Sequence, residues 1–304
     1  MGERGALQCF IAGRNVNDDQ MVVAVCCGRL QDLRQRWEHN IAQLYGEAFF
    51  VLLDCAHSAE ADALADTIRS AGGLVRFHGE RRGLSAARNS VLAAWPVSNI
   101  VFVDDDTELN REAITAARAA FSDGAHVVGA RLVPPELPVR WSWHFTPGQM
   151  HLVGWHPPGE APRTWGAFMG IDARFAHRNG LRFDARLGRT GRRLESGDDT
   201  SFVAAMKAAG ARETILATAV VHNVDPERFR VRYLARRAYW QGRSEIRRAQ
   251  PVAGLRKEWA RQTVPGAGLL AARLYTTAFI TGVIHEIADR NGCDKRRVPM
   301  RSTS

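Results

Sequence analysis

The sequence predicts an α/β fold with a mixed, mostly parallel β-sheet flanked by helices, followed by a helical C-terminal extension. Two observations support this expectation. Over residues 22–133, short apolar runs of strand length alternate with segments in which apolar residues recur at helical spacing, as in βαβ units. Several of these apolar runs also end in Gly or Asp, where α/β sheets bind their ligands.

The predicted elements follow one another in a regular order. Strands are expected at 22–26, 49–53, 74–77, 100–103 and 127–133. Helices are expected at 31–44, 59–71, 84–95 and 111–121. Right-handed crossovers then place Gly28, Asp54 and Asp104 along one edge of the sheet. The chain contains neither a GxGxxG fingerprint nor a P-loop.

The composition is that of an ordinary globular protein, with 45% hydrophobic and 24% charged residues among 304. Its five cysteines form no metal-spaced set, which favours a reducing cytoplasm. The start of the chain lacks the apolar core of a signal peptide. The apolar stretch 266–288 is interrupted by charges and indicates a packed or surface-lying helix. We therefore expect a cytoplasmic protein, either free or peripheral at the inner membrane face.

Three carboxylates, Asp104, Asp105 and Asp106, directly follow an apolar run. Because side chains alternate along a strand, Asp104 and Asp106 are expected on the same side. Carboxylate oxygens suit Mg²⁺ or Mn²⁺, which also bridge phosphate oxygens. The alternative is a solvated turn in which Thr107 or Asn110 caps the next helix. The triplet alone favours neither interpretation.

Later stretches carry further candidates. Asp198 and Asp199 begin a predicted helix, where Asp is common, and the functional alternative is that one of them faces a pocket as a general base. His222 ends the apolar run 215–221, as either a structural histidine or a metal ligand. The glycine-rich stretch 165–171 offers backbone that can approach a ligand.

Two segments differ from the sheet scaffold in composition. Residues 134–162 hold seven of the twelve prolines, and residues 141–165 hold four of the eight tryptophans. They predict either an aromatic platform for a sugar or flat aglycone, or a loop that packs on the core. Residues 226–261 hold eleven Arg or Lys against three Glu. This excess suits nucleic acid, anionic lipid or a phosphorylated ligand, or else a solvated helix face.

In their order and spacing, these motifs resemble family-2-type glycosyltransferases with the Rossmann-like GT-A fold, over about residues 22–248. The Asp triplet resembles the family's metal-binding DxD motif, and the segment 82–89 resembles its Gly-Leu-Ser-Ala-Ala-Arg-Asn segment. Asp54 matches the second-strand Asp that contacts the nucleotide base. Residues 197–200 resemble the Gly-Glu-Asp-x motif, whose Asp is the catalytic base. The first strand departs from the family pattern, since it runs into Cys27-Gly28-Arg29.

The resemblance implies a metal-dependent, inverting glycosyltransferase that moves one sugar from a nucleoside-diphosphate sugar, with UDP-sugars favoured. The acceptor is expected to be a small-molecule natural product or a cell-envelope intermediate, including a lipid-linked one. Mn²⁺ or Mg²⁺ is the implied cofactor, with Asp104, Asp106 and His222 as ligands. Asp199 is the implied base, and Asp198 stands where the family has Glu. The expected donor-binding residues are Cys27, Gly28, Arg29, Asp54, Gly83, Arg88, Asn89, Asp104, Asp105 and Arg243. The expected acceptor-binding residues are Trp143, Trp155, Trp165 and Gly166.

The predicted organisation is a catalytic domain over residues 1–225, with an acceptor loop at 134–165, and a basic helical region over 226–304. The segment 241–244 lacks the Trp of the QxxRW motif of processive synthases, which favours single addition. One rival function is a nucleotidyltransferase acting on a sugar phosphate. The other is a non-catalytic protein that binds an anionic polymer. The basic region is expected to contact a membrane surface and not nucleic acid, and the oligomeric state is not predicted.

Overall fold

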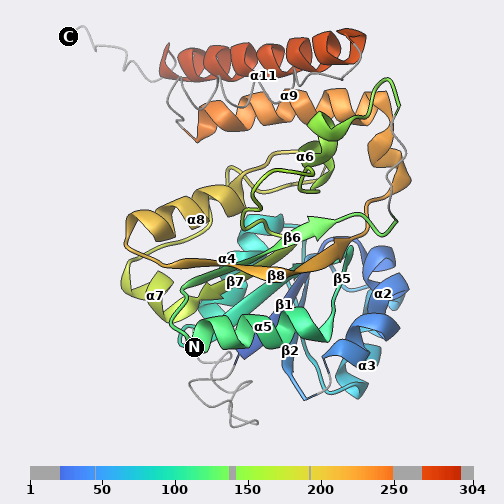
Figure 1. Cartoon of the computed structure of the whole chain (residues 1–304), viewed down its shortest axis with the longest axis vertical. Helices are drawn as coiled ribbons and strands as arrows, with labels where there is room; N and C mark the ends of the chain where they lie inside the picture. The colour runs from blue at the N-terminus through green and yellow to red at the C-terminus, as the bar shows by residue number, and fades with distance from the viewer. Residues whose placement is uncertain (1–20, 45, 137–141, 192, 249–268, 296–304) are drawn as a thin grey trace, which may run out of the picture.

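A mixed β-sheet forms the centre of the molecule (Figure 1). The computed structural model describes residues 21–44, 46–136, 142–191, 193–248 and 269–295. Within these residues the sheet has eight strands in the order β3-β2-β1-β4-β7-β6-β8-β5. The strands are β1 (Met21–Cys27), β2 (Ala48–Leu53), β3 (Leu74–Phe77), β4 (Asn99–Asp104), β5 (Thr107–Glu108), β6 (Val127–Val133), β7 (Phe168–Asp172) and β8 (Glu213–His222). The predicted mixed sheet is confirmed.

The parallel half of the sheet brings three strand ends to one edge. β1 pairs in parallel with both β2 and β4, and its register sets Cys26 beside Asp104. The loops that follow β1, β2 and β4 therefore open on the same edge, as the alternation of strands and helices predicted.

A short antiparallel pairing brings a distant part of the chain to this edge. β4 and β6 flank the antiparallel strand β7, and β8 runs parallel to β6. The two-residue strand β5 then pairs with the end of β8, which sets Thr107 opposite His222. His222 thereby reaches the Asp triplet from 116 residues further along the chain.

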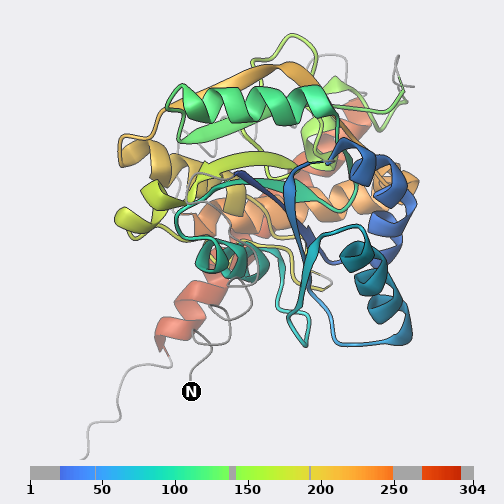
Figure 2. The same cartoon turned by 90° about the horizontal axis from the view of Figure 1, so that it is seen from below.

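Helices cover both faces of the sheet (Figures 1 and 2). One face carries α2 (Leu30–Gln43), α3 (Ala59–Ser70) and α5 (Arg111–Ser122). The other carries α4 (Leu84–Ala94), α7 (Ala173–Arg178) and α8 (Asp198–Ala208). The Asn110 side chain caps α5 by accepting a bond of 2.6 Å from the Ala113 N–H, as the turn interpretation had proposed. The predicted flanking helices are confirmed.

The C-terminal part packs on a separate apolar cluster. It comprises α9 (Val231–Arg247) and α11 (Leu269–Lys295), which lie side by side. The segment 142–156, with η1 (Pro147–Gln149) and α6 (Met150–Val153), fills the space below α9. The helical C-terminal extension is confirmed, whereas the domain boundary at residue 225 stays a prediction. None of the described helices is both long and apolar enough to cross a membrane.

Candidate active site

A cleft of about 480 Å³ opens at the carboxyl edge of β1, β2 and β4. Its floor consists of these strand ends, and its walls come from three later segments. The segment 151–154 and residues 163–167 form one wall, residues 189, 191 and 194–200 form another, and one face of α9 closes the third side. The Pro/Trp-rich segment thus contributes to the cleft through only part of its length.

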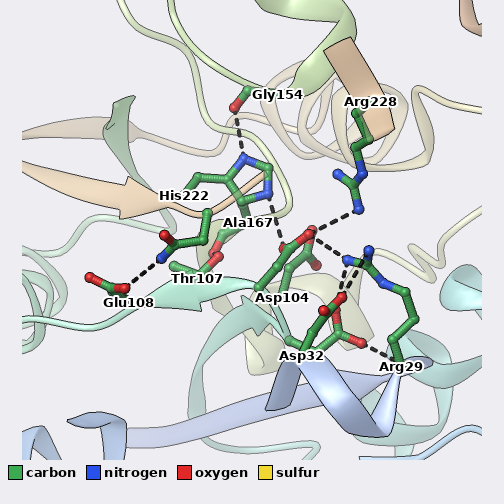
Figure 3. Close-up of polar contacts among 12 residues, drawn as sticks. Arg29, Asp32, Asp104, Thr107, Glu108, Gly154, Ala167, His222 and Arg228 are labelled. Carbon is green, nitrogen blue, oxygen red and sulfur yellow. Dashed lines mark hydrogen bonds and ion pairs between the residues drawn. The ribbon is translucent and has the colours of Figure 1, made fainter. Parts of the chain in front are cut away.

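The Asp triplet and His222 form the first acidic corner of this cleft (Figure 3). The possible donor atoms of Asp104, Asp106 and His222 lie within 4.8 Å of one another. The Nε2 atom of His222 lies 3.0 Å from Asp106 Oδ1, and its Nδ1 atom lies 3.1 Å from the Gly154 carbonyl oxygen. Two carboxylates and one imidazole therefore meet at the junction of β5 and β8.

Asp105 makes different contacts from those of Asp104 and Asp106. Its Oδ2 atom accepts hydrogen bonds from the N–H groups of Gly28 at 3.0 Å and Arg29 at 2.8 Å. Burial, together with the charge of Asp106, raises the pKa of Asp105 to about 6. Asp105 thus fixes the loop after β1, which lacks the family's usual sequence.

Asp106 is buried among cationic groups. Besides His222, it receives bonds from Arg29 and, at 3.0 Å, from Nη2 of Arg228. Burial opposes its charge, but His222, Arg228 and Arg29 outweigh this effect and hold the pKa of Asp106 well below its ordinary value. The carboxylate is ionised at neutral pH.

Arg88 connects the first acidic corner to a second one. This fully buried guanidinium donates to Asp104 at 3.0 Å through Nη2 and to Asp198 at 2.9 Å through Nη1. Ser85, also on α4, donates to Asp198 at 3.3 Å. Burial raises the pKa of Asp198, and Arg88 opposes this shift. Asp198 is therefore largely buried against α4, and only a small part of its surface reaches the cleft.

Asp199 lies beside it at the start of α8 and lines the cleft. Its Oδ2 atom accepts a bond of 2.8 Å from the Gly166 N–H, and Oδ1 accepts one of 2.6 Å from the Thr200 N–H. Neither oxygen pairs with a guanidinium in the described residues. Asp199 is the half-exposed member of the second corner, in the position that the sequence predicted for a base.

Asp54, at the end of β2, anchors the opposite end of the cleft. It accepts hydrogen bonds from Nδ1 of His78 at 2.7 Å and from the N–H groups of Arg82 at 2.9 Å and Gly83 at 2.8 Å. Burial opposes its charge, but these bonds hold its pKa below the ordinary value. Gly83 has a φ of 93°, so its contact with Asp54 depends on a residue without a Cβ.

Six of the predicted residues do not line the cleft: Gly83, which donates its N–H to Asp54, and five others. Arg243 lies on the opposite side of α9, where it bonds to Glu286 at 2.9 Å and to Asp289 of α11. Asn89 exchanges two bonds of 2.9 Å with the backbone of Phe183. Cys27 is buried beneath the loop and Trp143 is exposed. The fifth residue, Trp155, packs in the cluster below α9, and its indole donates to the His222 carbonyl at 2.7 Å.

The remaining predicted residues do line the cleft. They are Gly28, Arg29, Asp54, Arg88, Asp104, Asp105, Asp106, Trp165, Gly166, Asp198, Asp199 and His222. Gly83 contributes only its N–H to Asp54. Trp165 is stacked on His156 with ring centroids 4.0 Å apart, so its orientation is fixed.

Sequence reasoning missed the cationic wall of the cleft. Arg189 and Arg228 line it, as do Arg237 of α9 and Arg248, which directly follows α9. No hydrogen bond or ion pair of the Arg189 side chain occurs within the described part of the chain. The spacing of 237, 241, 245 and 248 along one face of a helix was the signal that could have identified this wall.

The sheet order, the acidic corner after β4 and the helical C-terminal part define a GT-A fold of the glycosyltransferase class. Residues 21–182, more than half of the chain, match the family model described as Glycosyl transferase family 2. The chain belongs to this family. A search of curated protein sequences finds no match.

Solved structures of two proteins share the fold at low sequence identity. A mannosyltransferase from Pyrobaculum calidifontis, solved with GDP-Man and Mn²⁺, is 15% identical with a TM-score of 0.58, over 94% of this chain and 93% of that one. Residues 1–349 of TarS from S. aureus are 13% identical with a TM-score of 0.51, over 90% and 92% of the two chains. The same TarS fragment solved with UDP-GlcNAc is 12% identical with a TM-score of 0.51, over 90% and 92% of the two chains.

Proposed function

We propose that this chain transfers a single sugar from a nucleoside-diphosphate sugar to an acceptor hydroxyl, with inversion at the anomeric carbon. One observation carries the proposal: two acidic corners face one cleft and differ in their surroundings. Asp104, Asp106 and His222 cluster at one corner, and Asp199 lies half-exposed at the other. The first suits a cation and a diphosphate, and the second suits a proton acceptor.

The first corner fits a divalent cation. Nδ1 of His222 faces the Gly154 carbonyl oxygen, and Nε2 faces Asp106 Oδ1 at 3.0 Å. Because both ring nitrogens face oxygen acceptors, the space at Nε2 suits either a proton or a bound cation. Two carboxylates and an imidazole suit Mn²⁺ better than Mg²⁺, which prefers oxygen alone. When bound, the cation neutralises the donor diphosphate and makes it a better leaving group.

The donor lies along the floor of the cleft in this proposal. Its base lies near Asp54 and its diphosphate near Asp104, with the loop of Gly28 and Arg29 between them. The neighbours were solved with GDP-Man or UDP-GlcNAc, which supports a nucleotide-sugar donor. UDP-sugars remain the first donors to test.

We assign the diphosphate clamp to Arg189 in place of Arg243. Arg189 lines the cleft, and among the described residues its side chain has no hydrogen bond or ion pair. Its charge, with those of Arg228 and Arg237, outweighs burial and lowers the pKa of the buried Tyr233 hydroxyl. This region is thus positive enough to favour a developing phosphate charge.

The chemistry then follows from the second corner. Asp199 accepts the proton of the acceptor hydroxyl, and that oxygen attacks the anomeric carbon from the face opposite the diphosphate. The bond between the anomeric carbon and the diphosphate oxygen breaks, and its electron pair leaves with the nucleoside diphosphate. Gly166 N–H holds Oδ2 of Asp199, and Trp165 beside it offers an apolar face to the acceptor. The acceptor is a small-molecule natural product or a cell-envelope intermediate.

Product analysis tests the reaction class. Wild-type protein with UDP-sugars, then GDP-sugars, and MnCl₂ should release free nucleoside diphosphate with a sugar of inverted anomeric configuration. Release of pyrophosphate would instead identify a nucleotidyltransferase. The variant Asp104→Asn/Asp106→Asn should lose the thermal stabilisation that donor and Mn²⁺ give together. Full turnover by this variant would refute the metal assignment.

A matched pair of variants tests the clamp. Arg189→Ala should raise the donor KM at least about tenfold, as expected for loss of a charge-assisted contact worth about 1.5–3 kcal/mol. Arg243→Ala, on the far side of α9, should leave the donor KM unchanged. The reverse result would return the clamp to Arg243.

A further inference from the structure

The exposed apolar side chains are concentrated on one helix. Seven large apolar side chains of the described residues are exposed, and five of them belong to α11, with exposures from 37% to 68%. These five are Leu270, Leu274, Ile280, Ile284 and Ile287. At 100° per residue they fall on one side of the helix. We call this side the outer face of α11.

The inner face of α11 is already fully used. Tyr275 and Phe279 are buried against α9 and the segment below it, and the Tyr275 hydroxyl donates to the His144 carbonyl at 2.9 Å. A Cβ on Gly242 or Gly282 would overlap backbone of the other helix, so α9 and α11 are in close contact. α11 therefore already packs tightly through its inner face, so the exposure of its outer face does not result from loose packing on α9.

A helix that is apolar on both sides requires a second apolar partner. On α11 the acidic residues Glu286 and Asp289 both pair with Arg243, toward α9. The outer face carries exposed Arg273 and no acidic side chain within the described residues. The sequence continues with Lys295, Arg296, Arg297 and Arg301, and the whole chain has a net charge of +9.

We propose that the outer face of α11 lies flat on an anionic lipid bilayer. Apolar side chains at helical spacing with basic flanks are the features of helices that bind at the lipid interface.

The charge argues for lipid over a second copy of the chain. A second copy would bring together two chains of net charge +9, whereas an anionic bilayer attracts this charge. Four arginines of the basic run 226–248 do not contribute to the docking surface, because they are paired with carboxylates inside the protein. They are Arg228, Arg243, Arg247 and Arg248.

The position of α11 also relates the surface to the cleft. α9 lies between them: its Arg237 and Gln241 line the cleft, while its Arg243 binds α11. Packed helices lie about 8–10 Å apart, so the cleft is roughly one helix layer above the bilayer. This proposal rests only on the outer face and holds for any reaction in the cleft. With the proposed transferase it implies an acceptor presented at a lipid surface.

Vesicle sedimentation tests the proposal. Full-length protein should bind vesicles of phosphatidylcholine with 30% phosphatidylglycerol, and weakly or not at all bind pure phosphatidylcholine. The variant Ile280→Gln/Ile284→Gln/Ile287→Gln should weaken binding to the anionic vesicles at least tenfold. Val97→Gln, at an exposed apolar position away from α11, is the matched control and should bind as wild type.

A second variant and a second measurement keep the test decisive. Arg273→Glu changes only an exposed charge, so it should fold and should weaken binding to the anionic vesicles. Wild type that ignores both vesicles, or variants that bind equally well, would overturn the proposal. So would a wild-type dimer, seen by analytical ultracentrifugation, that the triple variant dissociates without any lipid binding. Because binding is measured without turnover, its failure is distinct from failure of the transferase assignment.

Discussion

The two acidic corners of the cleft use the same residue type for different purposes. At the first, Asp105 and Asp106 are buried and receive bonds from the β1 loop, His222 and Arg228. At the second, Asp198 is enclosed by α4, and Asp199 is half-exposed. Within the described residues Asp199 accepts bonds from backbone N–H groups and the Thr200 hydroxyl, and none from a guanidinium. The hydrogen-bond donors around each carboxylate decide whether it stabilises the fold or is available for chemistry.

The same contrast appears within each pair of neighbours. Asp105 orders a loop while Asp104, with its side chain 27% exposed, faces the cleft. Asp198 neutralises Arg88 while Asp199 faces the cleft. In each pair of adjacent carboxylates, one side chain is therefore directed into the protein and the other faces the cleft.

We expect the largest effect from substitution of Asp199, the carboxylate of the second corner that faces the cleft. Asp199→Asn keeps the size of the side chain but removes the proton acceptor, so kcat should fall by about 10²–10⁴ with the fold intact. Asp198→Asn should instead lower the free energy of unfolding, because it weakens the partner of buried Arg88. Steady-state kinetics and urea denaturation of both variants measure the two effects. Equal losses of kcat without any change in stability would erase the distinction between the neighbours.

A smaller effect is expected where the corners are joined. A Cβ on Gly166 would overlap the Arg88 guanidinium, so Gly166→Ala should disturb both ion pairs of Arg88. Overpacking of this kind typically costs about 1–3 kcal/mol of unfolding free energy. Gly28→Ala is the control in the same cleft, since its Cβ meets nothing within 4 Å. Equal stability of the two variants in urea would show that the Arg88 bridge tolerates displacement.

A third effect concerns the stability of the protein at acidic pH. His156 accepts a bond of 2.8 Å from the Leu132 N–H and supports Trp165 near the second corner. Burial lowers the pKa of His156 to about 4, from an ordinary 6.5. The folded state therefore binds fewer protons than the unfolded one, and this stability is complete above pH 6.5 and lost as pH falls toward 4. The loss is at most about 3 kcal/mol.

Denaturation curves between pH 7 and pH 4 measure this loss, with His156→Asn as the comparison. The variant should show a flatter dependence in this range. A wild-type profile as flat as that of the variant would contradict the assignment. Because the pKa of Asp106 is held well below its ordinary value, Asp106 should keep its charge over the same range, whereas Asp105, with a pKa of about 6, should become protonated.

The sequence was sufficient for the parallel half of the sheet and for its functional edge. Strand-length apolar runs and right-handed crossovers determine where Gly28, Asp54 and Asp104 lie, because these follow from local pattern and chain geometry. The helix start at Asp198 and Asp199 could likewise be predicted. Their proximity to the Asp triplet depends on Arg88, and nothing in the local pattern indicates that its side chain spans both.

The sequence was insufficient where contacts depend on tertiary packing. His222 reaches Asp106 through a two-residue antiparallel pairing with β5, which is too short to give a periodic signal. The predicted ligand-binding roles of Trp143, Trp155 and Arg243 depended on residue type alone. A Trp or Arg is equally suited to a ligand site, a core or a helix interface. The contacts made by α9 and α11 decide these cases.

The cleft is built from contacts between distant parts of the chain. Asp106 binds Arg228 from 122 residues away, and Ser85 binds Asp198 from 113 residues away. Contacts of such separation form late, because loop closure must be complete before they contribute stability. During refolding, helix and strand signals should therefore return before nucleotide binding does. Recovery of nucleotide binding would then show that the distant contacts, and with them the whole fold, have formed.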